Sequence, residues 1–184
     1  MKKRIFFLLS AILMAGLAQA QDRYFTKNGN ISFYASTPLE TVEAHNNKAT
    51  SVIDITTGKM EFAVLMKAFQ FEKALMQEHF NENYVESDKY PKSTFAGQIT
   101  NPSAVDFKKD GTYPVKVKGN LTIHGVTKEI EAPGTVTVKN GNIKATSEFI
   151  VKPEDYNIQI PGVVREKIAK EVKVKADMDY QPLK

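Results

Sequence analysis

The stretch Gly134–Val151, "GTVTVKNGNIKATSEFIV", consists of two alternating apolar and polar runs on either side of an Asn-Gly pair. Asn140-Gly141 suits a type I′ turn, because both residues accept the positive φ that this turn requires and its twist matches that of the flanking strands. Before the pair, Val136 and Val138 share one face. After the pair, one face carries Ile143, Ala145, Ser147, Phe149 and Val151. A period of two around such a turn predicts an antiparallel hairpin with one buried face.

The same pattern recurs along most of the chain. Further turn signals are Asn28-Gly29, Thr57-Gly58 and Asp110-Gly111, each between alternating runs. We predict eight strands, at residues 30–36, 49–56, 60–68, 93–100, 113–123, 128–138, 142–151 and 170–180. The fold class is therefore all-β and mainly antiparallel, either a closed barrel or a sandwich. We favour an eight-stranded β-barrel, because closure removes exposed strand edges and there is little helix to cover them. A barrel of this size can enclose one small or elongated ligand.

One segment has the periodicity of a helix instead. In "FEKALMQEHFNENYVES" (residues 71–87), apolar and aromatic residues recur at helical spacing. This pattern predicts one α-helix over about residues 72–86, with an apolar stripe formed by Leu75, Met76, His79, Phe80 and Tyr84. A short second helix is expected after Pro161-Gly162, through "VVREKIAK".

The first twenty residues resemble a secretory signal peptide. Lys2, Lys3 and Arg4 precede an apolar run from Ile5 to Ala18, and Ala18-Gln19-Ala20 is an A-x-A cleavage site. The run is too short to span a membrane. We therefore expect cleavage between Ala20 and Gln21, one domain over residues 21–184, a periplasmic or secreted location and no stable membrane span.

Removing the leader changes the charge of the protein. The leader contains three basic and no acidic residues, so the net charge falls from +4 to +1. This balance gives no electrostatic reason to expect nucleic acid as a partner. The chain has no cysteine, so a hydrophobic core rather than disulfides must stabilise the exported domain.

The titratable residues do not form a catalytic or metal-binding motif. The three histidines, His45, His79 and His124, are not at metal-ligand spacing, and no nucleophile elbow, P-loop or zinc-protease motif is present. By strand parity His124 falls on the face of Lys116 and Lys118, so we expect it to face water, with Gly125 to Thr127 forming the turn. We expect no catalytic residues, no metal and no cofactor.

The remaining signal is a large supply of inward-facing apolar side chains. A barrel lined by Phe and Met suits a long apolar ligand, although the same residues can also pack against one another as a filled core. Composition leaves both readings open. Phe71 belongs to this apolar supply, and the predicted channel-lining residues are Phe33, Phe62, Val64, Met66, Phe69, Phe80, Tyr84, Phe95, Ile99, Leu121, Ile123, Phe149 and Met178.

Three ordered segments resemble the YceI-like, polyisoprenoid-binding periplasmic proteins. "KGNLTIHGVTKEI" (residues 118–130) is similar to that family's G-x-L-T-(aliphatic)-x-G-V-T-K segment. "HFNENYVESDKYPKSTF" (79–95) is similar to its stretch from helix to YP-x-x-x-F, and "FIVKPEDYNI" (149–158) to its F-x-(aliphatic)-x-x-x-D-(aromatic)-x-I segment. The resemblance implies an extended, lipocalin-like barrel with an apolar channel for an isoprenoid or similar lipid.

The chain also departs from the family pattern. Pro153-Glu154 and Asn157 stand where the family often has Arg and Gly, and the usual His-Ser of the first long strand is missing. The resemblance therefore carries over the channel but no headgroup contact.

These observations lead to one main functional hypothesis. We expect an exported, non-enzymatic binding protein that encloses a polyisoprenoid or fatty-acyl lipid, for carriage, storage or sequestration. One alternative is an enzyme on a calycin-like barrel that acts on a lipid or an isoprenoid quinone. A second alternative is a filled-core scaffold or adhesion protein. The sequence leaves the oligomeric state open and allows a homodimer.

Overall fold

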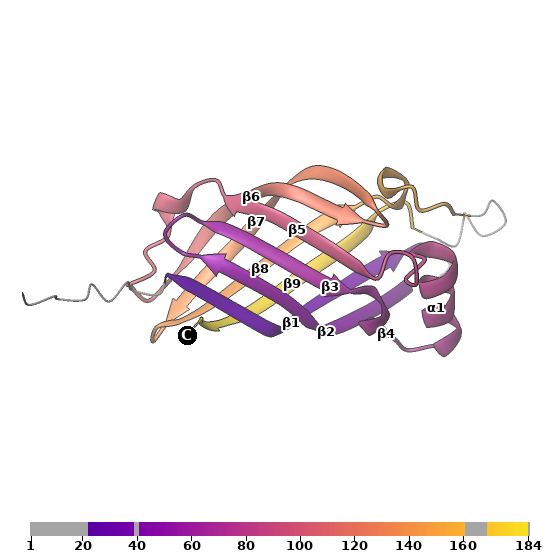
Figure 1. Ribbon diagram of the computed structural model, residues 1–184, viewed down its shortest axis with the longest axis horizontal. Helices are drawn as coiled ribbons and strands as arrows, with labels where there is room; N and C mark the ends of the chain where they lie inside the picture. The colour runs from indigo at the N-terminus through magenta and orange to yellow at the C-terminus, as the bar shows by residue number, and fades with distance from the viewer. Residues whose placement is uncertain (1–21, 39–40, 161–168, 184) are drawn as a thin grey trace, which may run out of the picture.

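The computed structural model describes residues 22–38, 41–160 and 169–183, and within them the chain forms a closed antiparallel β-barrel (Figure 1). Eight strands form the barrel in the spatial order β1-β9-β8-β7-β6-β5-β3-β2, and β1 pairs with β2 to close it. A short strand, β4, adds to the edge of β2. The strands are β1 (Arg23–Ser36), β2 (Thr41–Asp54), β3 (Lys59–Leu65), β4 (Gln70–Phe71), β5 (Lys92–Ile99), β6 (Gly111–Ile123), β7 (Val126–Lys139), β8 (Asn142–Val151) and β9 (Val172–Pro182). The predicted all-β, lipocalin-like fold is confirmed.

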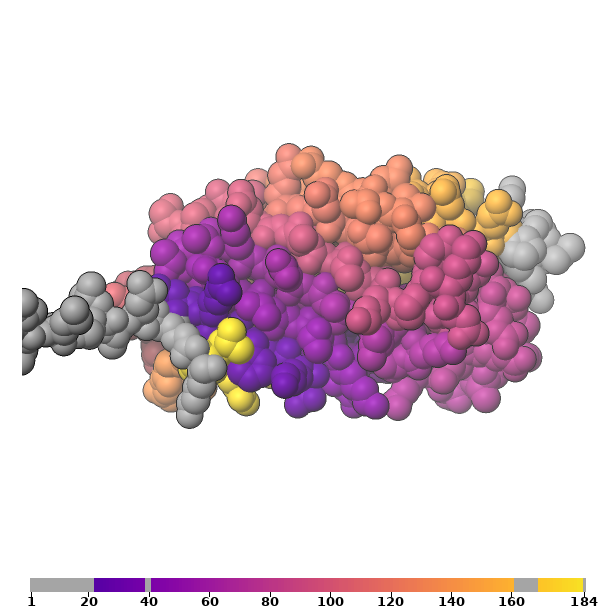
Figure 2. Space-filling model, viewed as in Figure 1, coloured from indigo at the N-terminus to yellow at the C-terminus, as the bar shows by residue number. Residues whose placement is uncertain are grey.

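The barrel is longer than it is wide, and its helix lies at one end (Figures 1 and 2). The predicted helix over about 72–86 is confirmed in place but is shorter than expected. It consists of α1 (Ala74–His79) followed by η2 (Phe80–Tyr84), a turn of π-helix. No residue of α1 is buried, and Leu75 is 61% exposed. The helix therefore contacts the barrel mainly through the residues at its C-terminal end.

Strand β1 is longer than predicted, because Asn28-Gly29 is not a turn, and β2 begins at Thr41 rather than at residue 49. Asn28 and Gly29 lie inside β1, where the register with β2 shifts on either side of Gly29. Gly29 lies against Met178: a Cβ at residue 29 would be 2.1 Å from the Met178 sulfur. The glycine thus permits close packing at an irregularity within the strand.

The turn predicted at Asn140-Gly141 is present, whereas the turn between β6 and β7 is shifted by one residue. Asn140 and Gly141 have φ values of 51° and 75°, as the predicted type I′ turn requires. Between β6 and β7 the positive φ values fall on His124 and Gly125, at 50° and 74°, and β7 begins at Val126. The expected turn over Gly125 to Thr127 is therefore wrong by one residue.

The interior of the barrel divides into a filled end and a second end that surrounds a cavity. The filled end contains the most deeply buried side chains, including Ile53, Val136 and Ile143. Helix α1 and strand β4 lie at the other end (Figure 1). This division determines which of the inward-facing residues can contact a ligand.

Two predictions fall on residues outside the described ranges: the leader at residues 1–20 and most of the short second helix after Pro161-Gly162. Among the helices of the described residues, none has the length and apolar character needed to cross a membrane.

Candidate functional site

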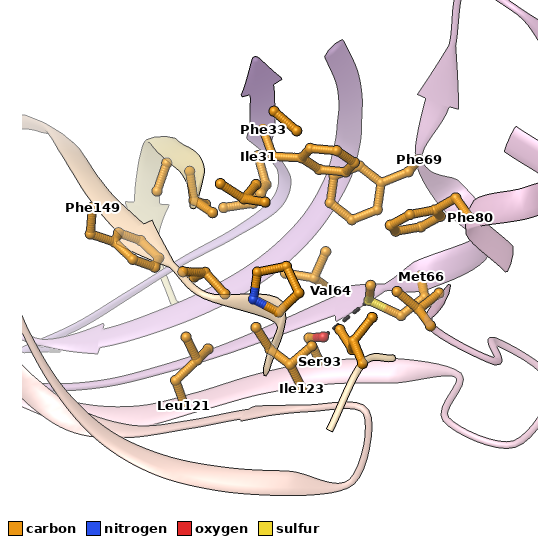
Figure 3. Close-up of a pocket in the computed structure, with 18 of the residues that line it drawn as sticks. Ile31, Phe33, Val64, Met66, Phe69, Phe80, Ser93, Leu121, Ile123 and Phe149 are labelled. Carbon is orange, nitrogen blue, oxygen red and sulfur yellow. Dashed lines mark hydrogen bonds between the residues drawn. The ribbon is translucent and has the colours of Figure 1, made fainter. Parts of the chain in front are cut away.

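The candidate site is an apolar cavity of about 430 Å³ inside the helix end of the barrel. Its wall comes from the strand segments nearest that end, together with η1 (Met66–Ala68), α1, η2 and η4 (Pro153–Tyr156). Figure 3 shows side chains converging on this space from opposite walls, with Phe149 and Leu121 on one side and Phe69 and Phe80 on the other. The volume lies within the range of small-molecule pockets, roughly 300–1,000 Å³.

Most of the channel residues predicted from sequence line this cavity. They are Phe33, Phe62, Val64, Met66, Phe69, Phe80, Tyr84, Phe95, Leu121, Ile123 and Phe149. Ile99 and Met178 do not line it: they are 2% and 1% exposed and belong to the core of the filled end. Alternation along a strand identifies the inward face, but it does not tell which end of the barrel a residue reaches. Contact of the lining residues with a ligand remains a prediction.

Four phenylalanines form an aromatic cluster where the helix meets the barrel. Phe80 of η2 stacks on Phe33 of β1 with ring centroids 5.5 Å apart, and it lies 5.6 Å from Phe69 and 5.1 Å from Phe71. Aromatic pairs at such separations attract one another beyond the effect of buried area. The cluster attaches an otherwise exposed helix to the barrel and forms part of the cavity wall.

The described part of the wall has few polar groups and no carboxylate, lysine or arginine side chain. Ser93 donates a hydrogen bond to the sulfur of Met66 at 3.0 Å. Burial raises the pKa of the Tyr84 phenol, which keeps it a neutral hydroxyl. His79 also lines the wall, and its Nδ1 lies 2.9 Å from Asn83 Nδ2. The wall is thus suited to a neutral apolar chain.

Several lining residues were not among the predicted site residues. Strand β9 contributes Val172, Val174 and Ala176, and β1 contributes Ile31. Their alternation with charged or polar residues is visible in the sequence, so the inward face of both strands could be predicted. The predicted channel-lining residues were mostly aromatic or thioether side chains, and small aliphatic residues were left out. Pro153, which begins η4, and Ile158, two residues after its end, also line the cavity. Neither lies in a periodic pattern, so nothing in the sequence indicated them.

His124 does not face water, contrary to the parity argument. Its side chain is only 10% exposed, with Nε2 2.7 Å from Glu86 Oε2 and Nδ1 3.1 Å from the carbonyl oxygen of Tyr156. The ring of Tyr90 lies 4.5 Å away, edge to face. Parity fails here because the left-handed φ of His124 ends the strand and turns its side chain out of the alternation. His124 is not part of the cavity wall.

Metal binding has no support within the described ranges. There, no three His, Cys, Asp or Glu side chains lie close enough together to hold a metal ion. His45 instead pairs with Glu43 on the surface, its Nε2 2.8 Å from Glu43 Oε1.

Comparison with known proteins identifies similar chains. A family model described as the YceI-like domain matches residues 25–180. A polyisoprenoid-binding domain from Saccharophagus degradans, implicated in plant cell wall breakdown, is 14% identical with a TM-score of 0.77, over 89% of this chain and 99% of that one. BcnA of Burkholderia cenocepacia is 16% identical with a TM-score of 0.69, over 83% and 96%.

A third similar structure is the YCEI protein of Campylobacter jejuni, 16% identical with a TM-score of 0.55, over 75% of this chain and 84% of that one. At these identities the three structures show a shared fold. The comparison with curated proteins found no match.

Proposed function

This chain belongs to the YceI-like family, and from that premise we propose that it is an exported binding protein that encloses one long apolar chain, of a polyisoprenoid or fatty-acyl lipid, in the barrel cavity. The observation that carries the proposal is the cavity of about 430 Å³ with its apolar wall. The polyisoprenoid-binding domain from Saccharophagus degradans, which has the same fold, supports the choice of ligand. The protein would carry, store or sequester this lipid.

The energetics favour a long chain over a short one. Burial of one methylene contributes about 0.8 kcal/mol, so ten buried methylenes contribute about 8 kcal/mol. Association costs about 4–15 kcal/mol in lost translational and rotational freedom. Because the described wall offers no charged partner, chain length rather than headgroup charge must supply most of the affinity.

Export is the second part of the proposal. The leader-like sequence of residues 1–20 supports it, with cleavage before Gln21 and a periplasmic or secreted location. N-terminal sequencing of protein from the cell envelope tests this part, and the expected first residue is Gln21. A chain that retains the leader contradicts it. The homodimer that the sequence allows is not needed, because the barrel closes within one chain.

The two alternative functions have less support. An enzyme on this barrel needs polar groups that converge on a bound substrate, and the described cavity wall holds no carboxylate. His124 has a sheltered ring and a carboxylate partner, but it lies outside that wall. A filled-core scaffold does not account for a cavity of this size.

Lipid extraction is the direct test of the ligand class. Protein produced in its own cell envelope is purified without detergent and extracted with organic solvent, and the extract is analysed by mass spectrometry. We expect one lipid class with a long apolar chain, in near-stoichiometric amount. An extract with no lipid above the level of a control protein from the same envelope contradicts the proposal.

A further inference from the structure

The His124 ring lies between two hydrogen-bond acceptors. A backbone carbonyl oxygen can only accept, so the Tyr156 oxygen at 3.1 Å requires a proton on Nδ1. An ionised carboxylate also only accepts, so the Glu86 oxygen at 2.7 Å requires a proton on Nε2. The form of histidine with a proton on both nitrogens is the imidazolium cation. We refer to this ring and its two bonds as the His124 bridge.

The bridge joins three segments that are distant in the sequence. His124 is in the turn between β6 and β7, Glu86 follows η2, and Tyr156 ends η4. Each segment also contributes cavity wall next to its bridge residue: Ile123 beside His124, Val85 beside Glu86, and Ile158 two residues beyond Tyr156. The bridge therefore connects three parts of the same end of the cavity.

Backbone conformation gives independent evidence that the site is constrained. Glu86 and His124 both have left-handed φ values, 44° and 50°, which are uncommon for residues other than glycine. Such residues persist where their surroundings hold them, and they cluster at ligand clamps and switch regions. Here two of them are bonded directly to each other.

Other titratable groups lie near the ring, and the positive Lys89 among them also interacts with the Glu86 carboxylate. Tyr90 packs edge to face on the ring, and Lys89 Nζ lies 5.0 Å from the centroid of Tyr90. Asp155 precedes Tyr156 in η4. Burial, followed by the charge of Asp155, raises the pKa of the Tyr156 phenol, so that group stays neutral. The Glu86 carboxylate is the charged group in direct contact with the ring.

We propose that His124 is a positioning residue whose imidazolium, bonded to Glu86 and Tyr156, holds together the three segments at the helix end of the cavity and slows the escape of a bound chain. The link between the three segments follows from the geometry of the chain alone. The slower escape of a bound chain rests on the proposed lipid-binding function. Loss of the ring removes the donor to both acceptors, so the three segments separate more readily without it.

The first test is made on ligand-free protein, by nitrogen-15 NMR of the histidine rings. We expect protons on both ring nitrogens of His124 at neutral pH, with the exposed His45 and His79 as references in the same spectrum. A neutral His124 ring with one unprotonated nitrogen at neutral pH overturns the proposal.

The second test measures amide hydrogen exchange in the bridged segments of the same ligand-free protein. The reporters are the Ser87 amide, bonded to the Asn81 carbonyl at 2.8 Å, and the Ile158 amide, bonded to the Pro153 carbonyl at 3.1 Å. His124→Asn retains a residue that tolerates left-handed φ but removes the charge. We expect protection at both amides to fall about tenfold or more, as for loss of a charge-assisted hydrogen bond. Unchanged protection overturns the proposal.

Two further variants separate positioning from a general loss of stability. His45→Asn removes a histidine with a carboxylate partner at an exposed site, and we expect no change at the two reporters. Glu86→Gln keeps an acceptor and removes the charge. We expect protection at both reporters to fall in Glu86→Gln as well, because the charge-assisted hydrogen bond to His124 is lost. Unchanged protection at both reporters in Glu86→Gln counts against the bridge.

The third test measures escape of a bound chain, with a fluorescent polyene fatty acid as the probe. We expect its dissociation from His124→Asn to be several-fold faster than from the unmodified protein or from His45→Asn. Equal rates contradict the role in retention. If neither protein binds the probe, the proposed function fails, while the ligand-free experiments still decide whether the bridge exists.

Discussion

At the scale of single residues, one hydroxyl pair connects two strands of the filled end that both flank β1. Tyr180 of β9 and Ser51 of β2 are 2% and 3% exposed, and their oxygens are 2.7 Å apart. Each single change, Tyr180→Phe or Ser51→Ala, leaves the other hydroxyl buried without its partner, which costs about 1–3 kcal/mol. We expect the double variant to be less destabilised than the sum of the two, by about 1 kcal/mol, in a double-mutant cycle from urea unfolding. Simple additivity would show that the bond contributes nothing.

The same residue predicts how stability changes at alkaline pH. Burial raises the pKa of Tyr180 to about 12, while an unfolded tyrosine ionises near pH 10. The folded form therefore keeps its proton where the unfolded form loses it, so the stabilisation is complete below about pH 10 and is lost as pH rises toward 12. We expect unfolding midpoints to fall over this range, and to fall less in Tyr180→Phe. An identical fall in both proteins contradicts the assignment.

At this scale the alternation along regular strands indicates most residues of the cavity wall but not the surroundings of His124. The period of two predicts that Phe149 and Leu121 point inward, as they do, because both lie within regular strands. It fails for His124 because a single left-handed residue breaks the alternation, and its partners Glu86 and Tyr156 are 38 and 32 residues away in the chain. Local pattern carries no information about such distant partners.

At the scale of elements, two tight turns offer a matched pair of glycines. Gly125 and Gly141 have φ values of 74° and 75°, so alanine is strained at both. A Cβ at Gly141 meets nothing within 4 Å, whereas a Cβ at Gly125 would be 2.6 Å from a ring carbon of Tyr90. We expect Gly141→Ala to cost about 1 kcal/mol of unfolding free energy, and Gly125→Ala to cost clearly more. Equal losses by thermal or urea unfolding would mean that Tyr90 moves aside freely.

The strands themselves could largely be predicted from the sequence, since each has a period of two and most are separated by recognisable turns. The turn predicted at Asn28-Gly29 is absent for a physical reason. Asn-Gly favours a tight turn, but here hydrogen bonding to β2 and β9 keeps both residues within a long irregular strand. The helix ended early because its last turn widens into π-helix at Phe80, which the side-chain spacing alone does not reveal.

At the scale of the whole molecule, the sequence predicted closure of the barrel but not how its interior is divided. The filled end and the cavity end contain similar apolar residues, for example Met178 and Met66, on similar strands. Which of them surround a space depends on the sum of side-chain volumes across eight strands, and no single segment encodes that sum. This is why alternation alone did not separate Ile99 and Met178 from the residues of the cavity wall.

A bound chain should stabilise the whole barrel by mass action. A ligand at 100 times its dissociation constant adds about 2.7 kcal/mol to the free energy of unfolding. We expect delipidated protein to melt at a higher temperature after addition of a long-chain lipid, and Ala176→Phe, which places a large ring in the cavity, to lose this shift. Ala63 of β3 does not line the cavity, so Ala63→Phe serves as the control that retains the shift.

Native mass spectrometry of protein purified from its own cell envelope tests the central claim most directly. We predict a mass above that of the polypeptide by one long-chain lipid in the unmodified protein and in Ala63→Phe, and a ligand-free mass in Ala176→Phe. A polypeptide mass without any adduct in the unmodified protein would contradict the claim that the cavity encloses a lipid chain.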